Sequence, residues 1–275
     1  MVELIRTPEQ VELAVITIRA KCLEYLKING MASMVIGMSG GLDSTVVAAL
    51  MRPVADELGI PLIGMVLPIE SMEEHTGMGI DASNLYCTNT QFWDDSVWKG
   101  EASQLTIFND FDDMFGPANA LIRGNVKARI RMIILYHEAA TTGGLVLSTD
   151  NLSEYLLGFW TLHGDVGDLS PIQHIFKGLE LPLIAEYLEI PKKYIDQQPT
   201  DGLGITATDV EQFGVDSYEE VDRRLIDYIE HGLRHELFCG VIKQYERTHY
   251  KRRGPYVIDR KYFNLDVPVK LRKNI

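Results

Sequence analysis

The side chains best suited to chemistry stand together at residues 37–44, directly after the apolar run Met34-Val35-Ile36. They are Gly37, Met38, Ser39, Gly40, Gly41, Leu42, Asp43 and Ser44. The glycines let the backbone approach an anion closely, the serine hydroxyls can bind phosphate oxygens, and the Asp43 carboxylate suits magnesium. A helix-like segment begins at Ser44 and directs its first N–H groups toward the same place. A tight turn is the structural alternative, but the hydroxyls and the carboxylate favour a phosphate site.

A second polar segment, Ser-Thr-Asp-Asn-Leu-Ser-Glu at residues 148–154, follows another short apolar run. Thr149 and Ser153 are residue types that cap helices, and Glu154 suits the positive end of a helix dipole. Both segments follow candidate strands of a parallel sheet, and ligands of such sheets bind at the carboxyl ends of the strands. We therefore expect Asp43 and Glu154 to meet in one crevice, where their carboxylates can hold one magnesium ion against ATP phosphates.

A third pattern lies in a long helical stretch that contains Gly-Asn-Val-Lys-Ala-Arg-Ile-Arg-Met at residues 124–132. Asn125 and Arg129 are four residues apart and share a helix face with Met132 and Tyr136. An arginine on a partly apolar face needs an anionic partner if it is buried. The alternative is an arginine whose long side chain reaches water or a salt bridge, and the helix pattern leaves both open.

Short apolar runs alternate with amphipathic stretches along the chain. Helices are expected at residues 8–27, 44–59, 111–115, 122–140, 218–229 and 233–246, and strands at 33–38, 61–68, 105–108 and 145–148. This alternation predicts an α/β fold, a doubly wound (Rossmann-like) parallel sheet with helices on both faces, in a single domain over residues 1–275. Residues 71–103 have no clean period and are interpreted as an irregular lid or interface segment, and residues 191–214 as a loop.

Composition argues against several classes of protein. The net charge of −13 over 275 residues disfavours broad nucleic-acid binding. The three cysteines are far apart and form no CxxC pair, so neither a disulfide framework nor a zinc site is predicted. Because the chain has no leader-like start and no apolar run of about 18 residues, we expect a cytoplasmic protein without membrane spans. Residues 256–275 are interpreted as a basic tail, part of a segment from 244 on with nine Lys or Arg against three acids.

The segment at residues 37–44 resembles the SGGxDS pyrophosphate loop of the N-type ATP pyrophosphatase superfamily, whose members split ATP into AMP and pyrophosphate. It is not a Walker loop, which would need a lysine where Leu42-Asp43 stands. Four further patterns follow in order, GNxxARxRM at 124–132, TDNxSE at 149–154, GFxTxxGDxxD at 158–168 and KRxxP at 251–255. With all five, the chain resembles ammonia-dependent NAD⁺ synthetases from about Val11 to Pro255, with residues 71–103 poorly matched.

The resemblance implies roles for individual residues. The family's magnesium ligands match Asp43 and Glu154, and its ATP contacts match residues 37–44, Thr149, Lys177 and Thr200. Taken alone, Lys177 would be a surface lysine and Thr200 an ordinary loop residue. The residues implied in catalysis are Asp43, Glu154, Lys177 and Thr200. Those implied in binding the second substrate are Asn125, Arg129, Leu162, Asp168, Tyr250 and Lys251.

The implied reaction is the amidation of deamido-NAD⁺ to NAD⁺ with ATP, magnesium and ammonia, through an acyl-adenylate that releases AMP and pyrophosphate. Leu162 stands where family members often carry a lysine, and Tyr250 where they carry a histidine. Nicotinate mononucleotide is therefore the alternative substrate. Ammonia is the expected nitrogen donor, since the glutamine-dependent version needs an appended glutaminase domain. The resemblance also implies a homodimer.

Two other classes share the loop at residues 37–44. A tRNA-modifying ATP pyrophosphatase usually needs paired cysteines or a basic RNA-binding domain, which the cysteine spacing and the acidic charge disfavour. An adenine-nucleotide sensor without chemistry is disfavoured because both expected magnesium ligands are present.

Overall fold

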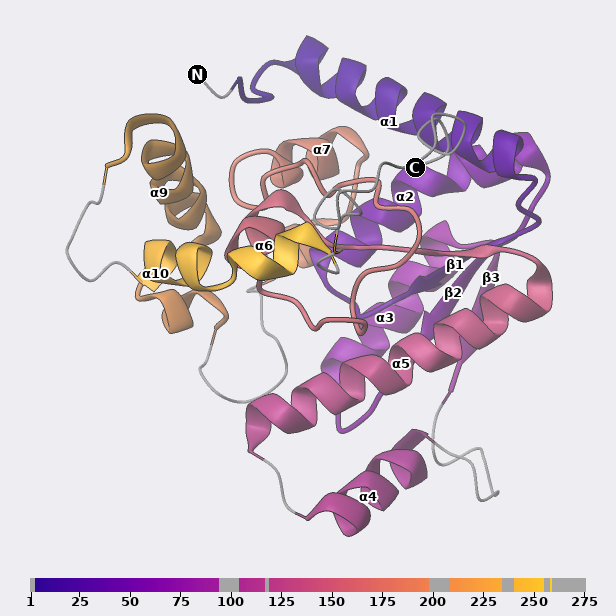
Figure 1. Ribbon diagram of the computed structural model, residues 1–275. Helices are drawn as coiled ribbons and strands as arrows, with labels where there is room; N and C mark the ends of the chain where they lie inside the picture. Colours follow the sequence, from indigo (N-terminus) through magenta and orange to yellow (C-terminus); the bar gives the residue numbers. More distant parts are fainter. Residues whose placement is uncertain are drawn as a thin grey trace.

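A parallel four-stranded sheet lies at the centre of the molecule (Figure 1). The computed structural model describes residues 3–93, 104–116, 119–197, 208–233, 240–254 and 258. The strands are β1 (Met34–Gly37), β2 (Leu62–Val66), β3 (Asn89–Phe92) and β4 (Leu145–Leu147), in the order β3-β2-β1-β4. In this register Val35 lies opposite Ile63 on one side and Val146 on the other. An isolated parallel bridge from Leu147 to Leu169 continues the sheet beyond β4.

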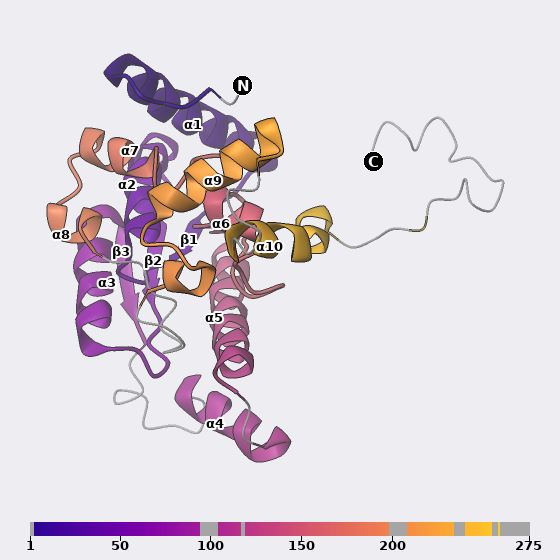
Figure 2. The same ribbon diagram turned by 90° about the vertical axis from the view of Figure 1, so that its left-hand side faces the viewer.

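Helices cover both faces of this sheet (Figure 2). They are α1 (Pro8–Asn29), α2 (Leu42–Leu58), α3 (Glu73–Tyr86), α4 (Gln104–Phe115), α5 (Ala120–Thr142), α6 (Leu152–Leu157), α7 (Leu181–Tyr187), α8 (Lys192–Ile195), α9 (Tyr218–His231) and α10 (Gly240–Arg247), with the 3₁₀ turns η1 (Val210–Phe213) and η2 (His249–Arg253). One face carries α1, α2, α3 and α7, and the other carries α5. This is the doubly wound arrangement that the sequence predicts. Among the helices of the described residues, none has an apolar stretch long enough to cross a bilayer.

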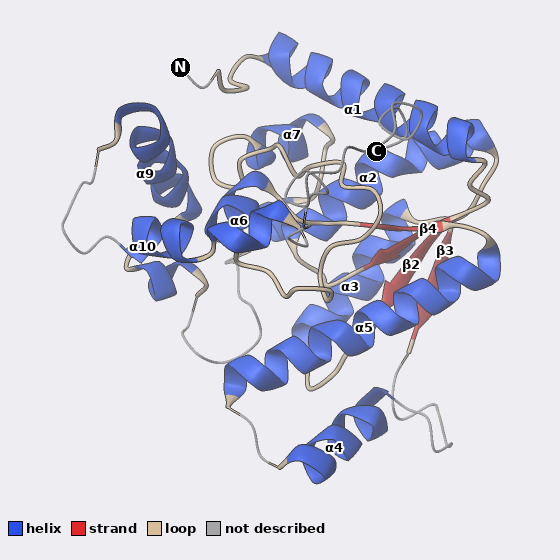
Figure 3. Cartoon of the chain, in the orientation of Figure 1, coloured by secondary structure: helices blue, strands red, loops and turns tan. Residues whose placement is uncertain are grey.

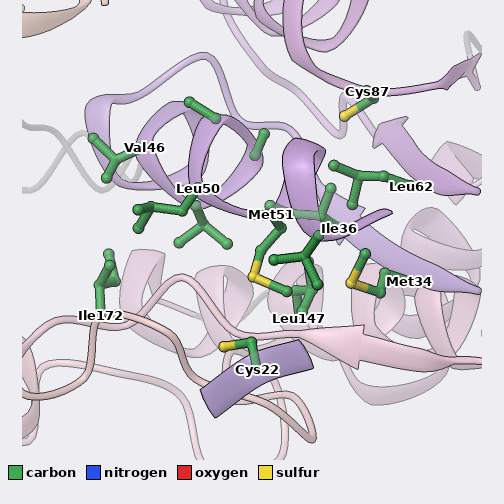
Figure 4. Close-up of a cluster of buried hydrophobic side chains, with 14 of the residues drawn as sticks. Cys22, Met34, Ile36, Val46, Leu50, Met51, Leu62, Cys87, Leu147 and Ile172 are labelled. Carbon is green, nitrogen blue, oxygen red and sulfur yellow. The ribbon is translucent and has the colours of Figure 1, made fainter. Parts of the chain in front are cut away.

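Alternate strand residues divide the core into two layers. Met34, Ile36 and Leu62 point toward α2 and its neighbours, where they join one large apolar cluster (Figure 4). Val35 and Ile63 point the other way and pack with side chains of α5. Because strands buried on both faces read as continuous apolar runs, these strands were recognisable from the sequence.

A third apolar cluster lies beyond the end of the sheet and joins α6, η1, α9 and α10. Figure 1 shows α9 and α10 beside α6, on the opposite side of α6 from the sheet. The cluster attaches α6, which begins just after β4, to the last two helices of the described chain. It therefore sets the position of residues 148–157 relative to α9.

The structure corrects four expectations (Figure 3). Residues 191–214, expected to be a loop, contain α8 and the 3₁₀ turn η1; residues 198–207 lie outside the described part. Residues 71–103 are not irregular throughout, because they contain α3 and the edge strand β3; residues 94–103 lie outside the described part. Residues 105–108 belong to α4 rather than to a strand. The helix expected at 233–246 is described only as α10, and Leu233 is not helical. In α3 only small residues, Gly79, Ala82 and Ser83, are fully buried, so no apolar stripe marks the helix.

Candidate active site

The loop at residues 37–44 connects β1 to α2 and is held by its own hydroxyls. The Ser39 Oγ accepts a hydrogen bond from the Gly41 N–H at 3.2 Å and lies 3.2 Å from the Ser44 Oγ. The Ser44 and Thr45 hydroxyls both donate to the Gly41 carbonyl, at 3.1 and 2.8 Å. These hydrogen bonds fix the conformation of the loop, and α2 begins within it, at Leu42.

Gly40 is required by the way this loop packs on α3. Its φ is +84°, and a Cβ there would lie 2.5 Å from the His75 carbonyl oxygen and 2.9 Å from the Gly79 nitrogen. A Cβ on Gly79 would in turn lie 2.6 Å from the Met38 carbonyl oxygen. Two backbones therefore touch here, which only glycine permits. The segment interpreted from the sequence as an irregular lid or interface segment thus contains a helix, α3, that packs against the 37–44 loop.

Asp43, Glu154 and Lys177 form a charge cluster at the carboxyl ends of β1 and β4. The Lys177 Nζ lies 3.0 Å from the Asp43 Oδ2 and 2.6 Å from the Glu154 Oε1. The Asn151 Nδ2 donates to the Asp43 Oδ1 at 2.8 Å, while its Oδ1 caps α6 by accepting the Glu154 N–H at 3.0 Å. The two strand-end segments therefore do meet, and the charged atoms of the cluster converge on one point.

Burial shifts the pKa values of the charged groups in this cluster. Burial is the largest effect on Glu154 and raises the pKa of its carboxyl to about 7; Lys177 opposes this shift and Asp43 adds to it. Burial also opposes the charge on Lys177, but the adjacent Asp43 and Glu154 raise the pKa of that ammonium group well above its ordinary value. When both carboxylates are ionised, the cluster carries one negative charge more than its ammonium group balances, so a bound cation would favour the ionised form of Glu154.

The donor set fits a magnesium ion. Within the described part of the chain, no group of three or more His, Cys, Asp or Glu side chains could hold a metal. Magnesium, however, is commonly held by one or two carboxylates together with substrate phosphates. Asp43 and Glu154 supply two such carboxylates beside the 37–44 loop. The excess negative charge and the oxygen ligands agree with magnesium in this position.

One further residue of this site has no signal in the sequence motifs. Tyr218, the first residue of α9, places its ring 4.5 Å from the Lys177 Nζ. The phenol is buried, and its hydroxyl has no hydrogen-bond partner among the described residues. Burial raises the pKa of Tyr218 well above its ordinary value. Asn151 was also missed, although it lies within the polar segment at residues 148–154, between Thr149 and Glu154.

Residues 158–168 form a loop that α5 holds from one side. The Asn125 Oδ1 accepts a hydrogen bond from the Thr161 hydroxyl at 2.7 Å, and the Arg129 Nε donates to the Leu162 carbonyl at 3.2 Å. Arg129 is exposed, so the solvent-facing alternative for this arginine is the one observed. Three of the expected substrate residues, Asn125, Arg129 and Leu162, are therefore neighbours.

Two of the other expected substrate residues, Asp168 and Lys251, make hydrogen bonds in or around this loop. The Asp168 carboxylate accepts hydrogen bonds from the Tyr136 hydroxyl at 2.9 Å and from the Val146 N–H at 3.0 Å. The Lys251 Nζ donates to the carbonyls of Gly158 at 2.8 Å and Trp160 at 2.5 Å. Tyr250 is 62% exposed.

Thr149 and Thr200 are the remaining expected ATP contacts. Thr149 is half-buried and lies two residues after the end of β4, in the same polar segment as Glu154. Thr200 lies outside the described residues, within 198–207. Its assignment to the ATP site stays a prediction.

Comparisons with known proteins agree with this geometry. The family model described as NAD synthase matches residues 15–255. An NH3-dependent NAD⁺ synthetase from Archaeoglobus fulgidus is 33% identical over 241 residues, covering 83% of this chain and 89% of that protein. One from Thermoplasma acidophilum is 31% identical over 226 residues, covering 81% and 88%.

Solved structures give the same result at the level of the fold. The structure of the NMN synthetase from Francisella tularensis matches with a TM-score of 0.73 and 25% identity, covering 92% of this chain and 99% of that one. An NH3-dependent NAD synthetase from Campylobacter jejuni matches with a TM-score of 0.70 and 22% identity, covering 90% and 99%. The resemblance drawn from the five motifs is thereby confirmed. The chain belongs to the NAD synthase family of ATP-binding ligases.

Proposed function

We propose that this protein is an ammonia-dependent NAD⁺ synthetase that amidates deamido-NAD⁺ with ATP. The observation that carries the proposal is the charge cluster beside the 37–44 loop. In this cluster the Lys177 Nζ lies within 3.0 Å of both the Asp43 and the Glu154 carboxylates. Relatives that are about 30% identical over most of the chain bear this name, which supports the same activity.

The reaction has two steps on this account. An oxygen of the nicotinate carboxylate attacks the α-phosphorus of ATP, and the bond from that phosphorus to the bridging oxygen of the β-phosphate breaks. Pyrophosphate leaves, and an acyl-adenylate remains. Ammonia then attacks the activated carbonyl carbon, AMP leaves with the former carboxylate oxygen, and the amide is formed. No side chain acts as a covalent nucleophile.

The protein contributes positioning and charge neutralisation. The 37–44 loop binds the departing pyrophosphate through its N–H groups, and the Lys177 ammonium group offsets the negative charge that builds on it. Asn151 fixes the Asp43 carboxylate through its 2.8 Å hydrogen bond. Asp43 and Glu154 would hold magnesium, which when bound neutralises phosphate charge and polarises the phosphoryl oxygens.

The second substrate lies beyond the α-phosphate, against the 158–168 loop. Arg129 is exposed beside Leu162, so its guanidinium retains donors for a phosphate or ribose oxygen. Lys251 and Asp168 shape the loop through the bonds described above. Tyr250 offers an exposed aromatic ring at its rim.

A second candidate substrate is nicotinate mononucleotide. It is favoured by Leu162 and Tyr250, which replace a cation and an imidazole of the dinucleotide-specific pattern. The similarity to an NMN synthetase structure over 92% of this chain supports it further. The chemistry at the carboxylate is the same for both substrates, because only the group beyond the mononucleotide differs.

We also propose that the protein is a homodimer. Large apolar side chains stay exposed where α4 meets the start of α5: Phe111, Met114, Phe115, Leu121 and Ile122. Figures 1 and 2 show α4 projecting from the body of the molecule there. Such a patch typically marks a protein interface. Light scattering should give the mass of two chains, and the double change Met114→Lys and Phe115→Lys should give the mass of one.

A product assay tests the function. ATP, magnesium and ammonium are supplied with deamido-NAD⁺ or with nicotinate mononucleotide, and AMP and amide formation are followed by chromatography. Equal amounts of AMP and NAD⁺ support the first substrate. Amide formation from the mononucleotide alone would move the assignment to the second candidate, and no amide from either would overturn the proposal.

A further inference from the structure

The backbone around Lys177 is held by a carboxylate that no motif marks. Asp222 lies in α9 and is fully buried. Its Oδ2 accepts the N–H groups of Gly178 at 2.8 Å and Leu179 at 3.1 Å. Its Oδ1 accepts the hydroxyl of Ser153, whose Oγ in turn accepts the Lys177 N–H at 2.9 Å. Three consecutive N–H groups, those of residues 177–179, therefore converge on Asp222 and its serine.

The backbone at Gly178 packs directly against the backbone at the start of α9. A Cβ on Gly178 would lie 2.2 Å from the Glu219 nitrogen and 2.3 Å from the Tyr218 carbonyl carbon. Tyr218 stands one helical turn before Asp222 on the same face of α9, and its ring contacts the Lys177 ammonium group. The start of α9 thus acts on Lys177 in two ways: the Tyr218 ring contacts its side-chain nitrogen, and Asp222 binds the N–H groups of the next two residues and the Ser153 hydroxyl that accepts the Lys177 N–H.

We propose that Asp222 is a positioning residue for catalysis, which fixes the backbone of residues 177–179 so that the Lys177 ammonium group reaches both Asp43 and Glu154. The inference rests on the proposed function, in which Lys177 neutralises the departing pyrophosphate. A long lysine side chain has many rotamers, so its nitrogen is placed accurately only if the backbone that carries it is fixed. Converging N–H groups need an acceptor, and a buried acidic side chain provides it.

The same loop contains a matched carboxylate for comparison. Glu180 is also buried, and its side chain accepts the N–H groups of Ile5 and Phe176, both at 2.8 Å. It stabilises the turn without bonding to residues 177–179 or to Ser153. Removing either carboxylate should cost folding stability, but only Asp222 should act on Lys177.

Four single variants, Asp222→Ala, Asp222→Asn, Glu180→Gln and Lys177→Met, and the double variant Asp222→Ala with Lys177→Met test this. Asp222→Ala should lower kcat for amide formation about 100-fold, with KM for the nicotinate nucleotide nearly unchanged. Asp222→Asn keeps an acceptor oxygen for both N–H groups and should stay within about fivefold of wild type. Glu180→Gln should do the same. In the Lys177→Met background, Asp222→Ala should cost less than about threefold, because its effect passes through the lysine.

A labelling measurement gives a readout that does not depend on turnover. The rate at which an acylating reagent modifies the Lys177 amine is followed by peptide mass spectrometry; it should rise at least about tenfold in Asp222→Ala and stay unchanged in Asp222→Asn and Glu180→Gln. If wild type forms no amide, the proposed function fails and the labelling still decides the positioning role. An equal loss of kcat from Asp222→Ala with and without Lys177, or equal labelling in all variants, would overturn the inference.

Discussion

The two sides of the site differ in how their charged groups are satisfied. The charge cluster of Asp43, Glu154 and Lys177 is largely buried, and its ammonium group lies within 3.0 Å of both carboxylates. In the 158–168 loop, by contrast, backbone carbonyl groups accept hydrogen bonds from two cationic side chains outside the loop, Arg129 and Lys251. The charge cluster therefore depends on three particular charged side chains. Side chains around the 158–168 loop can be replaced without removing any of these three charges.

This difference separates chemistry from substrate choice. Activation of a carboxylate by ATP needs the same charges whatever lies at the far end of the nucleotide. On the proposed function, we expect the choice of nucleotide to depend on residues in and near the 158–168 loop, where Leu162 and Tyr250 depart from the pattern that the resemblance implies. Changes in the charge cluster should therefore reduce turnover of either substrate, and changes at the loop should alter substrate affinity.

The largest effect is expected from Asp43→Asn. The amide keeps the shape and can still bond Asn151, but it removes one negative charge from the magnesium site, so kcat should fall about 1,000-fold for both substrates. Asp56→Asn is the matched control, because Asp56 lies on the same helix in an exposed pair with Arg52. Steady-state amide formation is the measurement. A loss below about tenfold would remove Asp43 from the chemistry.

A smaller effect, on KM for the nicotinate nucleotide and not on kcat, is expected from Lys251→Met. The methionine fills a similar volume but no longer donates to the carbonyls of Gly158 and Trp160. The loop should loosen, and KM for the nicotinate nucleotide should rise about tenfold while KM for ATP stays nearly constant. Lys193→Met, at an exposed pair with Asp81, is the control. An equal rise in both KM values would show that the two sides are not separable.

The buried side should also make the stability of the protein depend on pH. Burial raises the pKa of Asp222 from its ordinary 3.8 to about 7. Because the folded protein holds this proton more tightly than the unfolded chain, the resulting stabilisation is present below about pH 4 and is lost as the pH rises through 7. The free energy of unfolding of wild type relative to Asp222→Asn should therefore fall by up to about 1.4 kcal/mol per pH unit across this range. Denaturant titrations at several pH values measure it, and a difference independent of pH would contradict it.

The smallest signal, almost no thiol labelling in the folded protein, is expected at the two described cysteines of the core. Cys22 and Cys87 are 5% and 6% exposed, and burial raises the pKa of each thiol to about 11. At pH 7.5 only about one thiol in a thousand or fewer would be ionised, so iodoacetamide should label neither in the folded protein and both in guanidinium. Peptide mass spectrometry reads this out. Rapid labelling of either in the folded state would show that the core beneath the site opens.

The sheet and its main helices were predictable because apolar residues dominate them. Met34-Val35-Ile36 is buried on both sides and reads as a continuous run, and the 122–140 pattern lies within α5. The helix α3 was not predictable, because its contact face is made of small residues. A Cβ on Gly64 would lie 2.1 Å from the Ser83 Oγ, so close backbone packing rather than a large apolar stripe holds this helix. The polar edge strand β3 gave no apolar signal either.

The site was predictable to the extent that its residues follow strands. Asp43 and Glu154 stand just after β1 and β4, so topology alone brings them together. Lys177 has no such local signal, and only the resemblance to a family indicated it. Tyr218 and Asp222 are ordinary residues of a charged helix, and their burial follows from the packing of α9 against α6, which no short motif encodes.

The central claim is that the charge cluster serves the transfer of AMP to a nicotinate carboxylate. It is tested most directly with substrate whose carboxylate carries ¹⁸O, by mass spectrometry of the nucleotide product. The account predicts AMP in which one phosphate oxygen is ¹⁸O, formed in equal amount with the amide. Unlabelled AMP, or the formation of ADP and phosphate, would contradict it.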